Sequence, residues 1–417
     1  MQKKAFKTMF ARLWVYLAVL GPGLITASAD NDAPGIATYS MAGSKYGYQF
    51  LWLLLVITIG EVVVQAMAAR MGAVTGKGTA DLIRERFGVK ITFFAMLCLL
   101  AANMGTTIAQ FAGIAASAEL LGVSRFIAVP VAALLISFTV LQGSYRYVEK
   151  ILLVLCLSAL SYVISAFVIK PPWEEILQST LRPSFQSDPD YILAVLATIG
   201  TTITPWGIFY MQASVVDKGV DAKAYRLTRV DVVSGAIWGN VISAFIVICT
   251  AATLFVHGIA VDSAEEAARA LLPIAGEGAK YLFAAGLLGA SLLAASVLPL
   301  STTYAVCEAF GWERGLNQRR SDAPFFFGLY AIMIVVSVLV VFIPGIPLFK
   351  IMVFSQSLNA ILLPVLLVLV IKLANDKRLM GEWVNRKLQN VFAVSLTGLI
   401  SVITLAFVQT VDCACRG

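Results

Sequence analysis

The sequence predicts an all-α polytopic membrane protein with about eleven transmembrane helices, and three observations support this. Of its 417 residues, 59% are hydrophobic and 13% are charged, whereas soluble proteins carry about 25% charged residues. Apolar segments of about 20 residues, the length that crosses a bilayer as a helix, recur along the whole chain. Lys and Arg gather in alternate connections between these segments, which is typical of a multi-pass topology.

The predicted spans are joined by short loops, so we expect one transmembrane domain over residues 1–417. An odd number of helices in each half gives the two halves opposite orientations in the membrane. We therefore expect two inverted repeats of five helices, about 14–169 and 191–372, with one extra helix at about 389–410. An Ala- and Glu-rich piece in the loop 258–280 predicts a surface helix. The spans are roughly 14–46, 48–69, 91–121, 125–143, 148–169, 191–215, 232–257, 281–309, 325–343, 348–372 and 389–410.

The distribution of charge predicts the orientation in the cell membrane. With the N-terminus in the cytoplasm, roughly 23 of the 31 Lys and Arg fall on cytoplasmic segments, which is the positive-inside bias. The opposite side is acidic, and eleven spans then place the C-terminus outside the cytoplasm. We expect no cleavable signal peptide, because the first apolar segment is too long for one.

The first span contains polar residues at its centre. Asp30, Asn31 and Asp32 are followed by Pro34 and Gly35. Each Asp in a membrane interior costs about 2.5–3.5 kcal/mol on insertion scales. Pro34 removes an amide donor and Gly35 weakens the helix, so we expect the helix to break here. Unwound backbone at this depth must face protein or a watery cavity, and this pattern favours a cation site at the bilayer midplane.

The sixth predicted span is interrupted in the same way. Gly200 and Thr201 are followed by Thr204 and Pro205 in mid-span. Paired broken helices in corresponding positions of inverted repeats indicate the substrate site of a transporter. The end of a half-helix that bears carbonyl groups stabilises a cation. Thr hydroxyls in membrane helices often bond only to their own backbone, so lining the site and serving the helix remain equal alternatives for both Thr side chains.

The chain as a whole resembles the natural resistance-associated macrophage protein (NRAMP) family of divalent-metal transporters, almost end to end. The resemblance implies the inverted five-plus-five fold shared with leucine-type transporters, with a divalent metal ion as substrate. The matching motifs are Gly21-Pro22-Gly23-Leu24, Asp32-Ala33-Pro34-Gly35-Ile36-Ala37-Thr38, the segment 65–76, the Pro205 break, Ser355-Gln356 and Leu363-Pro364.

Departures from the family pattern point to a hard metal ion. The family's ligand Asp matches Asp32, but its ligand Asn is replaced by Gly35, and its ligand Met by Thr204. Oxygen ligands suit Mg²⁺, Ca²⁺ and Mn²⁺, whereas thioether sulfur selects softer metals. A wider pocket lined by oxygen suits Mg²⁺, which keeps several waters, and the combination resembles the NRAMP-related magnesium transporters. The metal site expected from this comparison comprises Asp32, Asp30, Asn31, Gly35, Thr201, Thr204 and Gln356.

The third span departs from the family in the residues that serve proton coupling. Where the family carries Asp and Glu, this chain has Thr107 and Gln110, and its only His, His257, lies at the end of a span. A proton relay needs titratable groups, so we expect uptake of Mg²⁺, and also Mn²⁺, without proton coupling. Gate or outer-shell roles are expected for Glu61, Thr107, Gln110 and Asn359, although a buried, protonated Glu61 without a role is an equal alternative.

Three alternatives to this hypothesis remain open. They are a proton-coupled Mn²⁺/Fe²⁺ symporter, a transporter of amino acids or organic cations, and a membrane sensor that binds metal without moving it. An enzyme is not expected, because the chain lacks a phosphate-binding Gly-Lys loop, a Cys/His cluster and a nucleophile–His pair. We expect no cofactor, no nucleic acid and no obligate protein partner beyond the metal substrate and the lipid bilayer.

Overall fold

The computed structural model describes residues 31–141, 159–316 and 318–416, and all its regular elements are helices. Each of the eleven predicted spans corresponds to a helix or a pair of helices in this part of the chain. Eight segments are long and apolar enough to cross a membrane, and two shorter apolar helices accompany them.

The spanning helices have the following bounds: α3 (Ala33–Tyr46), α4 (Leu51–Thr75), α5 (Thr79–Leu120), α6 (Arg125–Leu141), α8 (Leu160–Ile169), α10 (Pro189–Thr202), α11 (Pro205–Asp217), α12 (Tyr225–Thr253), α15 (Ala279–Phe310), α16 (Pro324–Val341), α17 (Leu348–Ala374) and α19 (Lys387–Arg416). The short elements between them are η1 (Gly47–Phe50), α9 (Trp173–Leu181), η3 (Phe255–His257), α13 (Ala264–Ala268), η4 (Arg269–Leu271), α14 (Leu272–Ala275), η5 (Gly276–Gly278), α18 (Lys377–Met380) and η6 (Gly381–Trp383).

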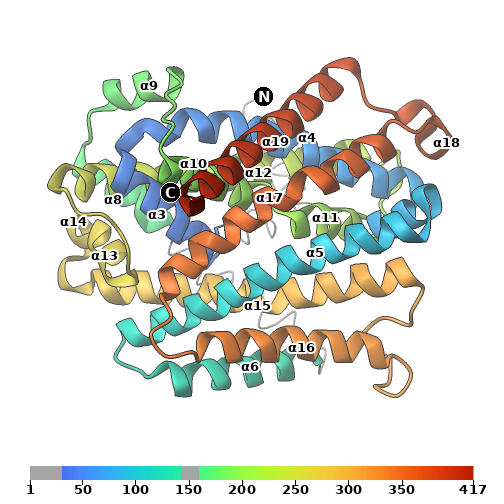
Figure 1. Cartoon of the computed structure of the whole chain (residues 1–417), viewed down its shortest axis with the longest axis horizontal. Helices are drawn as coiled ribbons and strands as arrows, with labels where there is room; N and C mark the ends of the chain where they lie inside the picture. The colour runs from blue at the N-terminus through green and yellow to red at the C-terminus, as the bar shows by residue number, and fades with distance from the viewer. Residues whose placement is uncertain (1–30, 142–158, 317, 417) are drawn as a thin grey trace, which may run out of the picture.

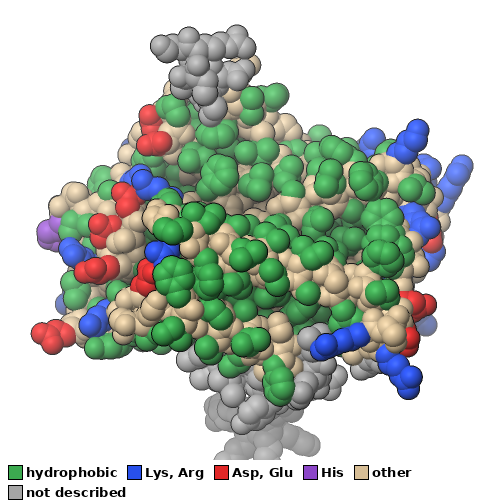
Figure 2. All heavy atoms as spheres, turned by 60° about the horizontal axis from the view of Figure 1, so that its bottom comes forward, with side chains coloured by type: hydrophobic (Ala, Val, Ile, Leu, Met, Phe, Trp, Pro, Cys, Tyr) green, Lys and Arg blue, Asp and Glu red, His purple; other side chains and the backbone are tan. Residues whose placement is uncertain are grey.

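The long helices run in roughly one direction, horizontal in Figure 1, with α9, α13 and α14 at one end and α18 at the other. Figure 2 shows a hydrophobic belt across the middle of the molecule, with charged side chains gathered at the two ends. On the outer helix α6, Leu134 is 72% exposed and Phe138 is 61% exposed. Such a continuous apolar surface exceeds what soluble proteins present to water. The protein is therefore a multi-pass membrane protein with the belt facing lipid.

The predicted break in the sixth span is confirmed. Helix α10 ends at Thr202, Ile203 leaves the helical conformation, and α11 restarts at Pro205. Thr204 caps the new helix, accepting a hydrogen bond from Gly207 N at 3.3 Å. Because Pro205 has no N–H, the carbonyl of Thr201 lacks the donor that would continue the helix.

The helix α3 begins at Ala33, at the point where the sequence predicts a break. Its capping residue Asp32 is extended, with φ −72° and ψ −179°, and Pro34 lies in the first turn. Pro is favoured there because the first turn has no use for its missing N–H. The part of the first span that precedes residue 31 lies outside the described residues.

Some elements extend beyond their predicted limits. Helix α5 starts at Thr79, twelve positions before the predicted 91, and bends at Gly88, whose φ is +77°. Residues 79–90 include several charged side chains, so their hydropathy is too low for a predicted membrane span. This first part of α5 lies beyond the apolar belt. The surface helix predicted in the loop 258–280 is confirmed as α13, and the other long loop contains α9.

The extra helix α19 is attached near its start by a buried polar cluster. Arg70 of α4 donates to Asn385 and, at 3.1 Å, to Gln389. Asn375 at the end of α17 exchanges two hydrogen bonds with Asn390, at 2.7 and 2.8 Å. The cluster ties α19 to both α4 and α17 at the same end of the molecule.

Candidate functional site

Asp32 lies buried at the start of α3, and both of its carboxylate oxygens accept hydrogen bonds. Oδ1 accepts from Gly35 N at 2.8 Å, which caps the helix, and Oδ2 accepts from Gln110 Nε2 of α5. A carboxylate offers about four lone-pair positions, so this arrangement leaves room for a cation. The positive end of α3 and the amide of Gln110 hold the side chain in place.

The end of α10 meets α3 two turns beyond Asp32. The hydroxyl of Tyr39, two turns into α3, lies 2.9 Å from the hydroxyl of Thr202 at the end of α10. The carbonyl groups in the last turn of α10 have no partners within the helix, and they carry the partial negative charge of a helix C-terminus. Thr201 is buried in this turn. The hydroxyl of Thr204 caps α11, and its oxygen already accepts a hydrogen bond from Gly207 N. A cation could bind only to the remaining lone pair of this oxygen.

Helix α17 closes the same region from the opposite side. Asn359 Nδ2 donates to Gln356 Oε1 at 2.9 Å and to the carbonyl of Gly200 in α10 at 3.4 Å. Its Oδ1 accepts from Thr106 of α5 at 3.2 Å. Thr106 is one turn before Gln110, so the side chain that contacts Asp32 and the one that contacts Asn359 lie on neighbouring turns of α5. The structure thus joins Gln356 and Asn359 to the end of α10, whereas Asp32 and Gln110 form a separate contact one turn further along α5.

Other predicted site residues face elsewhere. Asn31 turns to α12, where its amide donates to Gly239 O and accepts from Ser243, both at 3.1 Å. Thr107 donates to the carbonyl of Asn103 in its own helix at 2.7 Å. These contacts are those of helix packing, and the metal-site role expected for Asn31 and the gate role expected for Thr107 stay predictions. Asp30 lies outside the described residues.

Glu61 is buried in α4, next to the break but on its other side. It accepts from Asn240 Nδ2 at 2.6 Å and from Gln65 Nε2 at 3.3 Å. Gly60, the residue before Glu61, packs on Ile203. The Cδ1 atom of Ile203 lies 3.3 Å from the point where a Cβ of Gly60 would stand. Glu61 is therefore the neighbour of a residue that packs on the break between α10 and α11.

Sequence reasoning missed a sulfur atom near the site. Gly113 of α5 is packed so closely on Ala33 that a side chain there would overlap with the Ala33 methyl group. Met352 Sδ of α17 lies 3.6 Å from the same point. The thioether is therefore adjacent to the start of α3, and only the packing of three separate helices reveals it.

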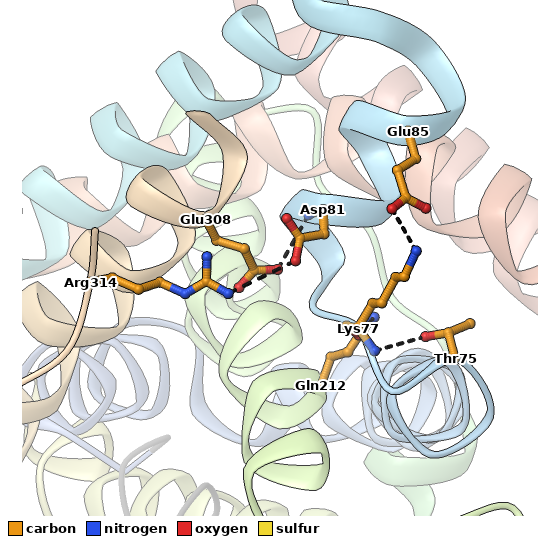
Figure 3. Close-up of polar contacts among 7 residues, drawn as sticks. All are labelled: Thr75, Lys77, Asp81, Glu85, Gln212, Glu308 and Arg314. Atoms are coloured by element: carbon orange, nitrogen blue, oxygen red, sulfur yellow. Dashed lines mark hydrogen bonds and ion pairs between the residues drawn. The ribbon is translucent and has the colours of Figure 1, made fainter. Parts of the chain in front are cut away.

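Beyond the break, a cavity of about 500 Å³ runs along α11 from Phe209 to Lys218 and is lined by α11, α15 and the α4–α5 connection. In Figure 3, Glu308 of α15 faces Asp81 at the start of α5, and Arg314 reaches toward Asp81. Glu308 Oε1 accepts from Asp81 N at 3.3 Å, and Arg314 Nη2 lies 3.9 Å from Asp81 Oδ2. These charged groups make the wall of the cavity polar.

The α4–α5 connection is held to α11 at the edge of this cavity. Gln212 of α11 donates to the carbonyl of Lys77 at 2.8 Å and accepts from Thr79 Oγ1 at 2.6 Å, and Lys77 also pairs with Glu85 (Figure 3). Gly78 packs directly on the Glu308 carboxylate, where any Cβ would overlap with it. Sequence reasoning missed this junction, because its members are scattered over four segments.

Comparison with known proteins identifies the family. The profile described as "Natural resistance-associated macrophage protein-like" matches residues 23–410. The chain belongs to this family. Among curated relatives of this family member, the divalent metal cation transporter MntH of Bacillus subtilis (strain 168) is 27% identical over 401 residues, covering 94% of this chain and 90% of the relative. MntH 1 of Pseudomonas aeruginosa is 28% identical over 407 residues, covering 93% of this chain and 90% of the relative.

Solved structures support the fold of this NRAMP-family chain. A manganese transporter of Eremococcus coleocola superposes with a TM-score of 0.78 at 23% identity, covering 94% of this chain and 86% of that one. Mhp1, a nucleobase-cation-symport-1 family transporter, gives a TM-score of 0.55 at 15% identity, covering 95% of this chain and 92% of that one. The predicted inverted-repeat fold is thereby confirmed.

The possible ligand atoms near the start of α3 include the oxygens of Asp32 and Gln110 and the sulfur of Met352. Within residues 31–141, 159–316 and 318–416, no group of three or more His, Cys, Asp and Glu gathers around a metal position.

Proposed function

We propose that this protein transports divalent metal cations across the cell membrane by alternating access, with Mg²⁺ as the preferred ion and Mn²⁺ as a second substrate. The observation that carries the proposal is the buried Asp32 carboxylate at the start of α3, the helix that the carbonyl end of α10 contacts two turns later. Membership of the NRAMP-like family and the divalent metal transport named for its relatives support the same class of substrate.

The preference for Mg²⁺ follows from the ligand types. Thr204 stands where the family has its ligand Met, and Gly35 stands where it has its ligand Asn, so both positions lose a ligand and leave space. Hard cations prefer oxygen, and Mg²⁺ retains waters that fill such space. The ligands we propose are Asp32 with the carbonyl groups of Thr201 and its neighbours, and with Gln356 acting directly or through water. Asp30, Asn31 and Thr204 remain part of the proposal in weaker roles.

We further propose that transport is not coupled to protons. The side chain that contacts Asp32 from α5 is the neutral Gln110, and Thr107 bonds only to its own helix in the described contacts. With the basic end of the molecule in the cytoplasm, an inside-negative potential favours entry of a divalent ion by about 4.6 kcal/mol per 100 mV, twice the value for a unit charge. The cavity along α11 is then the cytoplasmic exit. In this scheme residues of about 14–169 and 191–372 form the two repeats.

The decisive experiment measures flux in proteoliposomes that contain a Mg²⁺-sensitive dye and, in parallel, a pH-sensitive dye. We expect Mg²⁺ and Mn²⁺ to enter under an inside-negative potential without a change in the lumenal pH. Acidification that accompanies metal entry would instead establish a proton-coupled symporter. Binding without flux would establish a sensor, and absence of both would exclude metal as the substrate.

A further inference from the structure

A cavity of about 530 Å³ lies between α5, the end of α17 and α18, at one end of the molecule (Figure 1). Among the described residues, its wall carries three cationic side chains, Arg86, Lys372 and Lys377, and one carboxylate, Asp376. The cavity along α11 differs, because its wall has three acidic and three basic side chains. The cavity at α18 therefore has an excess of positive charge, and we call it the basic cavity.

The single carboxylate of the basic cavity is already engaged within the protein. Arg86 Nε pairs with Asp376 Oδ2, and Asp376 Oδ1 accepts a hydrogen bond from Arg378 N at 2.9 Å. Glu85, the residue before Arg86, pairs with Lys77 Nζ at 2.6 Å. Neither acid is therefore free to balance the two lysines of the cavity.

The cationic groups of the basic cavity keep unused donors. Within the described residues, Lys372 and Lys377 form no ion pair and no side-chain hydrogen bond. Arg86 meets Asp376 through Nε, and its Nη1 and Nη2 groups donate no hydrogen bond to a described residue. The Arg86 side chain is 49% exposed, so these groups are accessible from outside. A guanidinium fork beside two ammonium groups suits a phosphate, whose oxygens accept charge-assisted hydrogen bonds.

The basic cavity lies at the border of the hydrophobic belt. Lys372 is in the last turn of α17, and Val368, one turn earlier on the same face, is 40% exposed. On α5, Ile91 and Phe94 follow the cavity and are 42% and 53% exposed. Figure 2 shows the same transition, with charged side chains gathered where the belt ends. A phosphate in the cavity would thus lie at the depth of lipid headgroups, with apolar surface beside it for acyl chains.

We propose that the basic cavity binds the headgroup phosphate of an anionic phospholipid, taken from the leaflet at this end of the molecule. Basic pockets between transmembrane helices suit such headgroups. Arg86 belongs to α5, Lys372 to α17 and Lys377 to α18, so one headgroup would bridge three elements. Further along the same two long helices, Thr106 of α5 bonds to Asn359 of α17 near the end of α10. The lipid would hold these two helices together at their ends, whichever metal the protein transports.

The test compares thermal unfolding of the purified full-length protein in detergent with added dioleoylphosphatidylglycerol or dioleoylphosphatidylcholine. EDTA is present, so that divalent ions do not bridge protein and lipid, and native mass spectrometry counts the bound lipid. We expect phosphatidylglycerol to bind and to raise the Tm more than phosphatidylcholine does, because a ligand of the folded state stabilises it. High ionic strength should weaken this effect.

The decisive variant combines Lys372→Gln with Lys377→Gln, which breaks no ion pair or side-chain hydrogen bond of the described residues. It should weaken phosphatidylglycerol binding by about tenfold or more, because it removes two cations from the headgroup site. The matched control combines Lys223→Gln with Arg320→Gln, which removes two exposed charges outside the cavity wall and should keep wild-type binding.

Three results would overturn the inference. The first is equal binding of the two lipids by the wild-type protein. The second is an unchanged affinity for phosphatidylglycerol in the folded double variant, or an equal loss in the control. The third is a rise in Tm with soluble sn-glycerol 3-phosphate that equals the rise with phosphatidylglycerol, since this would assign the cavity to a soluble phosphate compound and exclude the lipid as its particular ligand.

Discussion

Replacing Asp32 with Asn is the sharpest test of the transport site, because the structure shows how the variant can keep its fold. Asn caps a helix about as well as Asp does, so the bond from Gly35 N to the Oδ1 atom survives. The amide of Gln110 can turn to present its Oε1, which has no hydrogen-bond partner, to the new NH₂ group. The substitution therefore removes the charge and little else.

The expected loss is large. Removing one charge from a buried, paired arrangement costs about 3–5 kcal/mol, which corresponds to about 150- to 5,000-fold in the affinity for the divalent ion. Mg²⁺ binding by calorimetry and dye-reported uptake in proteoliposomes measure it. Asp188→Asn is a matched control, since Asp188 also caps a helix that has a Pro in its first turn, accepting from Tyr191 N at 3.2 Å, but far from the break. Wild-type uptake by folded Asp32→Asn protein, or an equal loss in the control, would refute the reasoning.

Three further predictions concern the surroundings of the site. Gly200→Ala places a methyl group against the backbone of α17 and should lower the free energy of unfolding by about 1–3 kcal/mol. The control Gly328→Ala, in open space on α16, should leave the Tm unchanged or raised. Equal Tm values for the two variants would contradict the packing argument. Met352→Leu should leave the Mg²⁺ to Mn²⁺ uptake ratio unchanged, and a clear shift in that ratio would make the thioether a ligand. The double variant Gly35→Asn with Thr204→Met should raise competition by Mn²⁺ over Mg²⁺ in uptake assays; unchanged selectivity would undercut the argument from missing sulfur.

The break in the sixth span and the start of α3 were predictable from sequence, because Pro205 and Pro34 act through local backbone chemistry. The directions in which side chains point were not predictable from the sequence. Asn31 bonds to Gly239, which lies 208 residues further along the chain, and no local pattern encodes that contact. The start of α5 was predicted too late, because hydropathy detects the apolar part of a helix and misses a charged turn outside the lipid.

The neutral residues of α5 were likewise predictable in type but not in contact. The absence of an acid at Gln110 was evident from the sequence, and it led to the expectation of uncoupled transport. That its amide would donate to Asp32 depends on how α5 packs against α3, which only the folded structure provides.

The hydroxyl pair of Tyr39 and Thr202 has a consequence for the speed of the transport cycle. Thr202 already donates its single proton to the carbonyl of Thr198 at 2.8 Å, so Tyr39 must be the donor across the gap between α3 and α10. A neutral bond of this kind contributes about 1 kcal/mol, so it breaks and reforms readily at ordinary temperature. The two half-helices thus keep their register at rest, yet this contact adds almost nothing to the barrier when they swing apart.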